Sequence, residues 1–95
     1  MQNILEGKTI LIAGAGGIGN ALAVRYAAEG ANVVLGDIDL ATAQQAVDEI
    51  AEAGGSCVAT VLDGADEQSV AAAVALCLER YDRLDGLHAN FAFMA

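Results

Sequence analysis

The hydrophobic pattern of the chain alternates between short continuous apolar runs and longer stretches with helical spacing. Apolar runs that are cut off by glycine or polar residues are typical of strands buried on both faces of a sheet. The predicted strands are, in chain order, residues 9–13, 32–36, 57–62 and 84–89.

Between these strands, apolar side chains recur at intervals of three and four residues, which predicts amphipathic helices. The first helix covers residues 17–29, and a glycine follows it in the position of a C-terminal cap. Asp39 is a plausible N-cap for the second helix, which glycines 54 and 55 close. Asp66 can cap a third helix, whose apolar positions extend to Tyr81.

Strict alternation of strand and helix predicts a parallel sheet with right-handed crossovers. We therefore expect one α/β, Rossmann-like domain over residues 1–95, with strand order 3-2-1-4 and three crossover helices. In that order two helices cover one face and the third lies alone on the other, so the doubly wound domain is incomplete. The fourth strand leaves an apolar edge, which predicts marginal stability or oligomerisation.

The loop between the first strand and the first helix is rich in glycine. Gly14, Gly16 and Gly19 match G-x-G-x-x-G, in which glycine permits a tight turn, close approach to a pyrophosphate and close helix–strand packing. The amino end of the helix also offers N–H groups and a partial positive charge to an anion. The predicted phosphate-binding residues are Gly14, Gly16, Gly17, Ile18 and Gly19.

An acidic residue follows the second strand. Asp37 lies 18 residues beyond Gly19, where a carboxylate can accept both hydroxyl hydrogens of an adenosine ribose and would repel a 2′-phosphate. Because no Lys or Arg is placed nearby, the pattern favours NAD over NADP as the cofactor. The alternative is that the glycines merely form a turn and that Asp37, with Asp39, starts a helix.

Together these segments resemble the short-chain dehydrogenase/reductase family over essentially the whole chain. The resemblance rests on residues 7–14, 17–19, 36–39, 62–63 and 84–90. It implies the NAD(H)-binding portion of an oxidoreductase, in which Asp63 contacts the adenine amine and Asn90 lies near the cofactor at the end of the fourth strand. Ile38 and Leu62, beside the two aspartates, complete the expected dinucleotide site.

The chain departs from the family pattern in three places. Its loop is G-x-x-G-x-G, one residue shorter than the family's G-x-x-x-G-x-G, and the family's Asn-Ala-Gly is replaced by the bulkier Asn90-Phe91-Ala92. Neither Tyr26 nor Tyr81 is followed four residues later by lysine, so the family's Tyr-x-x-x-Lys acid–base pair is absent. The expectation is a chain truncated before the catalytic Ser/Tyr/Lys region, without catalytic residues and inactive alone.

Composition excludes several other classes of protein. Thirteen acidic and four basic residues give a net charge of −9, and the scattered cations form no basic patch for nucleic acid. No apolar run approaches the ~18 residues of a membrane span, and no secretory signal is recognised. Cys57 and Cys77 lack metal-ligand spacing and are interpreted as reduced thiols of a cytoplasmic protein. No metal site is expected, and His88 is interpreted as a packing residue.

Two further functions remain open from the sequence. One is a non-catalytic Rossmann-type interaction module that self-associates through the uncovered sheet face or the fourth-strand edge. The other is a methyltransferase that uses S-adenosylmethionine, although Ile18 stands where its last loop glycine would be. The partners expected from the main interpretation are NAD(H) or an adenine nucleotide and a second copy of the chain, with neither nucleic acid nor membrane.

Overall fold

The computed structural model describes residues 4–14 and 16–89, and these residues contain every predicted strand and helix. The elements are β1 (Thr9–Ala13), α1 (Gly16–Ala28), β2 (Asn32–Asp37), α2 (Leu40–Glu52), β3 (Ser56–Val61), α3 (Glu67–Tyr81) and β4 (Gly86–Ala89). The predicted strand boundaries lie within two residues of the observed ones, so the periodicity of the sequence identified each element correctly.

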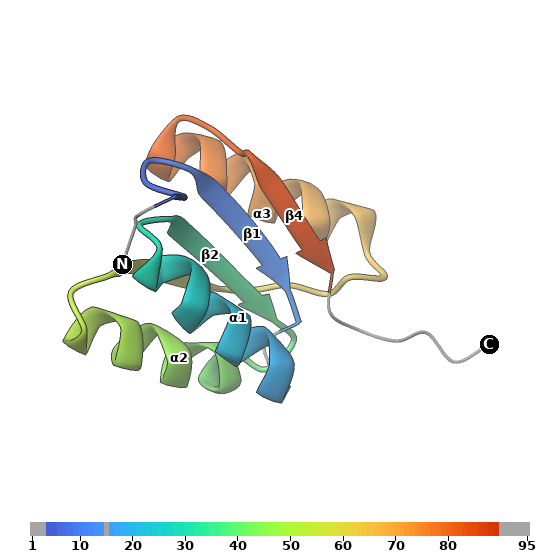
Figure 1. Ribbon diagram of the computed structural model, residues 1–95. Helices are drawn as coiled ribbons and strands as arrows, with labels where there is room; N and C mark the ends of the chain where they lie inside the picture. Colours follow the sequence, from blue (N-terminus) through green and yellow to red (C-terminus); the bar gives the residue numbers. More distant parts are fainter. Residues whose placement is uncertain (1–3, 15, 90–95) are drawn as a thin grey trace.

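The strands form one parallel sheet in the order β3-β2-β1-β4, as predicted. Ile12 of β1 lies beside Leu35 of β2 on one side and beside His88 of β4 on the other. Because each helix runs back against the strands, the carboxyl ends of the strands and the amino ends of the helices share one end of the domain (Figure 1). We call this end the carboxyl edge of the sheet.

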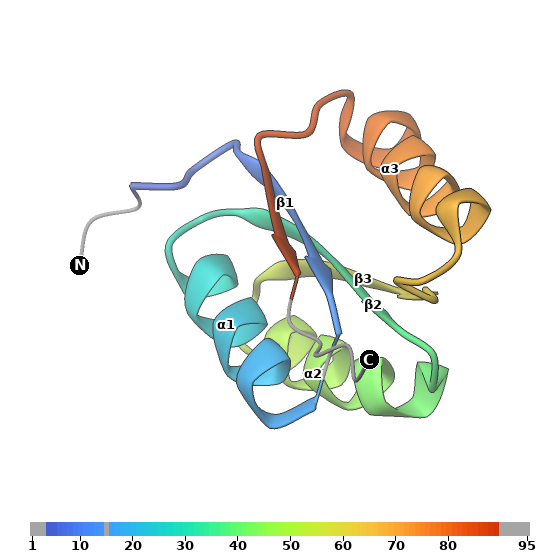
Figure 2. The same ribbon diagram turned by 90° about the vertical axis from the view of Figure 1, so that its right-hand side faces the viewer.

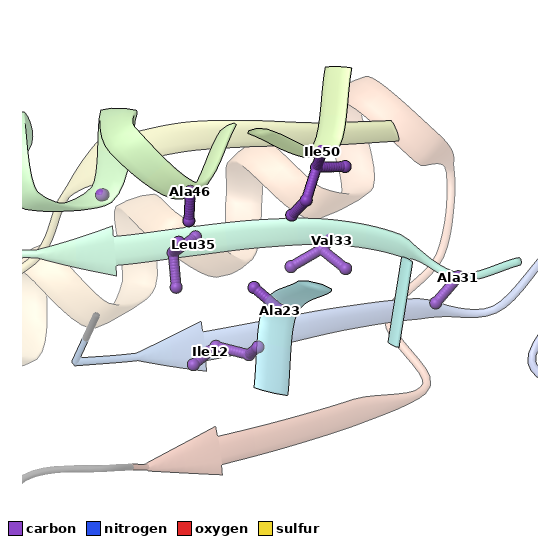
Figure 3. Packing of buried hydrophobic residues seen from close by; sticks show 8 residues of the cluster. Ile12, Ala23, Ala31, Val33, Leu35, Ala46 and Ile50 are labelled. Atoms are coloured by element: carbon purple, nitrogen blue, oxygen red, sulfur yellow. The ribbon is translucent and has the colours of Figure 1, made fainter. Parts of the chain in front are cut away.

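The helices α1 and α2 cover one face of the sheet, and α3 lies on the opposite face (Figure 2). The core between the sheet and the helix pair is shown in Figure 3 and consists of Ile12, Ala23, Ala31, Val33, Leu35, Ala43, Ala46 and Ile50. The core beneath α3 is smaller and consists of Leu11, Ala13, Val34, Leu62, Ala73 and Cys77. Successive residues of β1 therefore point to opposite faces, as the pleat of a strand requires.

Two aspartates cap helices as predicted. The side chain of Asp39 accepts a hydrogen bond from the Ala41 amide at 3.1 Å, and that of Asp66 accepts one from the Gln68 amide at 2.9 Å. Each cap satisfies an N–H group that the first helical turn leaves without an internal partner. The caps thereby fix where α2 and α3 begin, directly after the loops at the carboxyl edge.

The strand β4 is the least covered part of the sheet. Leu87 pairs in register with Leu11 of β1, yet Leu87 is 57% exposed whereas Leu11 is fully buried. The single helix on this face packs on β1 and β2. The lone third helix thus leaves the face of β4 open, as the strand order predicted.

A polar clamp ties the amino end of β1 to the segment before β4. Asp85 Oδ2 accepts hydrogen bonds from the Thr9 amide and from Arg83 Nε, each at 2.8 Å, and its Oδ1 accepts one from Arg83 Nη2 at 2.7 Å. The Asp85 amide in turn donates to the Thr9 carbonyl at 2.8 Å. The Arg83 guanidinium, and then the Thr9 amide, hold the pKa of Asp85 below its usual range.

Replacing Asp85 by asparagine is expected to lower the Tm at neutral pH and to reduce the acid sensitivity of the fold. A carboxyl whose folded-state pKa lies below the unfolded value of ~3.9 contributes stability above that pH, and this stability is lost as the pH falls through the folded pKa. The Tm difference between Asp85→Asn and the unchanged chain should therefore shrink between about pH 4 and pH 2. Asp82→Asn, at an exposed helix end, is the control; equal acid sensitivity of all three proteins would contradict the clamp.

Candidate functional site

The glycine loop joins the carboxyl end of β1 to the amino end of α1. The Gly14 amide donates to the Gly36 carbonyl at 2.8 Å, which binds the start of the loop to the end of β2. Gly14 and Gly16 have φ values of 101° and 30°, a region of backbone conformation that favours glycine. The loop can therefore turn sharply enough for α1 to begin at Gly16.

The amino end of α1 is open to solvent. Gly16, Gly17 and Ile18 are exposed, while Gly19 is buried within the domain. A Cβ atom built on Gly16 or Gly17 would meet no protein atom within 4 Å, so packing of the chain itself does not require glycine at these positions. The residues leave open space beside the first turn of a helix, whose N–H groups have no intrahelical partner. Such a cradle fits a diphosphate.

Asp37 is the last residue of β2 and lies directly after Gly36. Its Oδ1 accepts a hydrogen bond from the Asp39 amide at 2.8 Å, and its backbone carbonyl accepts one from the Leu62 amide at 2.9 Å. Asp39, not Asp37, is the N-cap of α2, and Asp37 contacts the start of the helix through its bond to the Asp39 amide. This bond holds the Asp37 carboxylate at the carboxyl edge of the sheet, where β2 ends.

The segment after β3 completes this edge. Leu62 is 3% exposed, and a Cβ on Gly36 would lie only 2.6 Å from the Leu62 Cβ. The close approach needs glycine at position 36 and brings Asp63 toward the end of β2. The Leu62 side chain is buried in the core beneath α3, so only the backbone of Leu62 can contact a ligand. Ile38, in contrast, presents a side chain that is 69% exposed.

Asp63 is held by a local hydrogen-bond network. Its amide donates to Ser69 Oγ at 2.8 Å, and its Oδ1 accepts from the Ala65 amide at 3.0 Å. Ser69 lies on the first turns of α3, so the loop and the helix fix each other. The sequence did not reveal that Ser69 binds the Asp63 amide or that Leu62 requires glycine at position 36. For Gly36, the one sequence signal was its position directly before the acidic residue Asp37.

The structure therefore brings the predicted residues together from three separate loops. The loops after β1, β2 and β3 are joined by the bonds from Gly14 to Gly36 and from Leu62 to Asp37. Asn90, together with Phe91 and Ala92, lies outside the described residues, so the nicotinamide end of the expected site is not part of this geometry.

The two cysteines lie in the cores of the domain. Cys57 belongs with the core of the α1–α2 face and Cys77 with the core beneath α3. Within residues 4–14 and 16–89, no three His, Cys, Asp or Glu side chains come close enough together to bind a metal ion. Over the same residues, no helix is sufficiently long and apolar to span a membrane.

Both thiols are expected to react slowly with a thiol reagent at pH 8. Burial raises the pKa of Cys57 to about 12 and also raises the pKa of Cys77, so little of the reactive thiolate is present. We expect 5,5′-dithiobis(2-nitrobenzoic acid) to modify the folded chain at least about tenfold more slowly than the chain in urea. Equal rates in the folded and unfolded chains would show that the thiols are accessible and ionised.

The chain is similar to known dehydrogenases over most of its length. The family pattern described as short chain dehydrogenase matches residues 8–94. The chain is 38% identical over 87 residues to 7α-hydroxysteroid dehydrogenase of Escherichia coli K12, covering 90% of this chain and 34% of that protein. The chain thus spans about a third of the length of the curated relatives it matches.

Several solved structures share the fold of this chain. A hydroxysteroid dehydrogenase from Escherichia coli superposes with a TM-score of 0.91 at 36% identity, over 96% of this chain and 39% of that one. A 7α-hydroxysteroid dehydrogenase complexed with NADH and 7-oxo glycochenodeoxycholic acid gives 0.85 at 37% identity, over 90% and 34%. A metagenomic short-chain oxidoreductase in complex with NADP gives 0.80 at 31% identity, over 86% and 38%.

Proposed function

The chain belongs to the short-chain dehydrogenase family, and from this membership we propose that it is the NAD(H)-binding portion of an oxidoreductase. One observation carries the proposal. The hydrogen bond from the Gly14 amide to the Gly36 carbonyl, 2.8 Å long, joins the loop that precedes α1 to the end of β2, directly before Asp37. A dinucleotide needs this combination, because its diphosphate is anionic and its ribose hydroxyls are donors.

Each part of the cofactor has a proposed partner in the chain. The amides of Gly16, Gly17, Ile18 and Gly19 bind the diphosphate, and Gly14 provides the turn that exposes them. The Asp37 carboxylate accepts from the adenosine ribose hydroxyls and remains oriented by the Asp39 amide. When bound, the nicotinamide supplies hydride transfer; the residues of this chain bind and orient it.

The adenine is proposed to lie between the exposed side chain of Ile38 and the loop that contains Leu62 and Asp63. Ile38 offers apolar surface to the flat face of the base. The Asp63 carboxylate, fixed through Oδ1 by the Ala65 amide, accepts from the adenine amine through its other oxygen. By family resemblance, Asn90 is proposed to lie near the nicotinamide end of the cofactor.

NAD is the proposed dinucleotide, in preference to NADP. The Asp37 carboxylate would repel a 2′-phosphate, and residues 26–79 contain no Lys or Arg to neutralise it. Similar structures contain either nucleotide, so the preference rests on this chain's own charges.

Calorimetric titration of the folded chain with NAD, ADP-ribose and NADP tests the proposal. We expect saturable heat with NAD and ADP-ribose, and binding of NADP at least about tenfold weaker, because one uncompensated charge contact costs ~1.4 kcal/mol or more. Circular dichroism confirms that the sample is folded. Absence of heat at millimolar NAD would overturn the cofactor assignment, and equal affinity for NADP would overturn the preference.

Self-association is the proposed partner interaction, through the open face and edge of β4. Leu87 exposes apolar surface there, and an unpaired strand edge can add a strand from another copy. Sedimentation over a concentration series should show dimers that Leu87→Asp disrupts; a monomer at all concentrations would contradict this.

We also propose a reducing, cytoplasmic location, since both cysteines are free thiols in separate cores.

A further inference from the structure

A groove lies between the carboxyl-terminal ends of α1 and α2, at the end of the domain opposite the glycine loop. The two helices are linked near their amino ends, where Asn20 Nδ2 donates to the Thr42 carbonyl at 3.5 Å. At their far ends they leave a cavity of about 330 Å³. Its lining residues are Val24, Ala27, Ala28, Glu49, Ile50, Ala53 and Gly55.

The floor of the groove is apolar and is set by Gly55. A Cβ on Gly55 would lie 2.7 Å from Ile50 Cγ2 and 3.2 Å from the Ala27 Cβ, so the absence of a side chain lets α1, α2 and the start of β3 meet. Ile50, which forms part of this floor, is 2% exposed and belongs to the core. The alanines around it are too small to fill the space above. The volume is at the lower end of that of small-molecule sites.

The groove carries negative charge that the described protein does not neutralise. Glu49 is its only charged lining residue, and α2 has no basic residue in its last turn. Both helices direct the negative ends of their dipoles toward this place. The nearest cation along α1, Arg25, is paired with Glu29 at 4.0 Å. Acidic residues at a helix carboxyl end are normally unfavourable, and a bound cation would relieve this.

We propose that this groove binds a small primary alkylammonium ion. The ammonium group pairs with the Glu49 carboxylate and the helix ends, and the alkyl chain lies against Val24, Ala27 and Ile50. Charge complementarity excludes an anion, and the apolar floor disfavours an inorganic cation that keeps its water shell. A chain of about four carbons fits within a cavity of about 330 Å³.

The test is a titration of the isotope-labelled chain with n-butylammonium chloride, followed by amide chemical shifts at constant ionic strength. We expect saturable shifts at residues 27–28 and 53–55, with a Kd on the order of 1 mM, and at least about fivefold weaker binding of n-butanol, which lacks the charge. Glu49→Gln should weaken butylammonium binding at least about fivefold, to the level of the alcohol.

Two further variants make the test specific to the groove. Glu52→Gln removes a neighbouring charge that does not line the groove and should change the Kd less than about twofold. Ala53→Leu fills the groove at an exposed position and should abolish the shifts. The proposal is overturned if butanol and butylammonium bind equally, if Glu49→Gln and Glu52→Gln behave alike, or if the shifts lie at residues 16–19. The same spectra report whether each variant is folded.

Discussion

Replacing Asp37 by alanine is expected to weaken NAD binding by about 10- to 100-fold, because hydrogen bonds to a charged group contribute ~1.5–3 kcal/mol. NADP binding should fall much less, since the variant also removes the charge that repels the 2′-phosphate. The dissociation constant of NADP divided by that of NAD should therefore fall toward one or below it. Calorimetry with both nucleotides measures this ratio directly.

Two other variants separate the charge of Asp37 from its structural contact. Asp37→Asn keeps an oxygen that can accept from the Asp39 amide, the bond that is 2.8 Å long here, but it loses the negative charge. It should fold like the unchanged chain and show the same change of nucleotide preference. Asp48→Asn, an exposed acidic position on α2, controls for net charge and should bind NAD normally. Unchanged NAD affinity in Asp37→Ala would remove the ribose assignment.

Replacing Gly30 by alanine is expected to destabilise the fold by about 2–4 kcal/mol, a large share of the 5–15 kcal/mol typical of a domain. Gly30 has φ +94°, and an added Cβ would lie 2.9 Å from the Glu6 Cα. The substitution therefore adds a backbone clash to a strained conformation. The Gly30 amide also closes the end of α1 by donating to the Ala27 carbonyl at 3.0 Å.

Gly54→Ala is the matched control for this prediction. Gly54 has a similar φ of +87°, but a Cβ there would meet nothing within 4 Å. Gly54→Ala should lower the free energy of unfolding by about 1 kcal/mol, from conformational strain alone. Urea unfolding followed by circular dichroism gives both free energies of unfolding. Equal costs in the two variants would show that the approach of Glu6 to Gly30 does not constrain the fold.

The fold was predictable because its signals are local. Continuous apolar runs, helical spacing and the capping side chains of Asp39 and Asp66 each depend on residues close together in the chain, and all were identified correctly. Given the expected strand order 3-2-1-4, the handedness of crossovers placed the third helix alone on its face of the sheet. The start of β4 was placed two residues early, because Leu84 packs beneath α3 and Asp85 forms the clamp instead of extending the strand.

The features that sequence reasoning missed are contacts between distant parts of the chain. Thr9 and Asp85 are separated by 76 residues, and no spacing rule relates them. Likewise, the need for glycine at positions 30 and 36 comes from Glu6 and Leu62, which approach only after the sheet has formed. At the site, the sequence predicted which residues gather, but not the two backbone bonds that join their loops.

We propose that the amides at the start of α1 and the carboxylate of Asp37 bind one dinucleotide at the carboxyl edge of the sheet. Amide chemical shifts of the labelled chain during titration with ADP-ribose test it most directly, since this ligand carries the diphosphate, both riboses and the adenine. We expect saturable shifts at residues 16–19, 36–38 and 62–63, and none at residues 53–55. Shifts confined to another surface, or none at millimolar ligand, would contradict it.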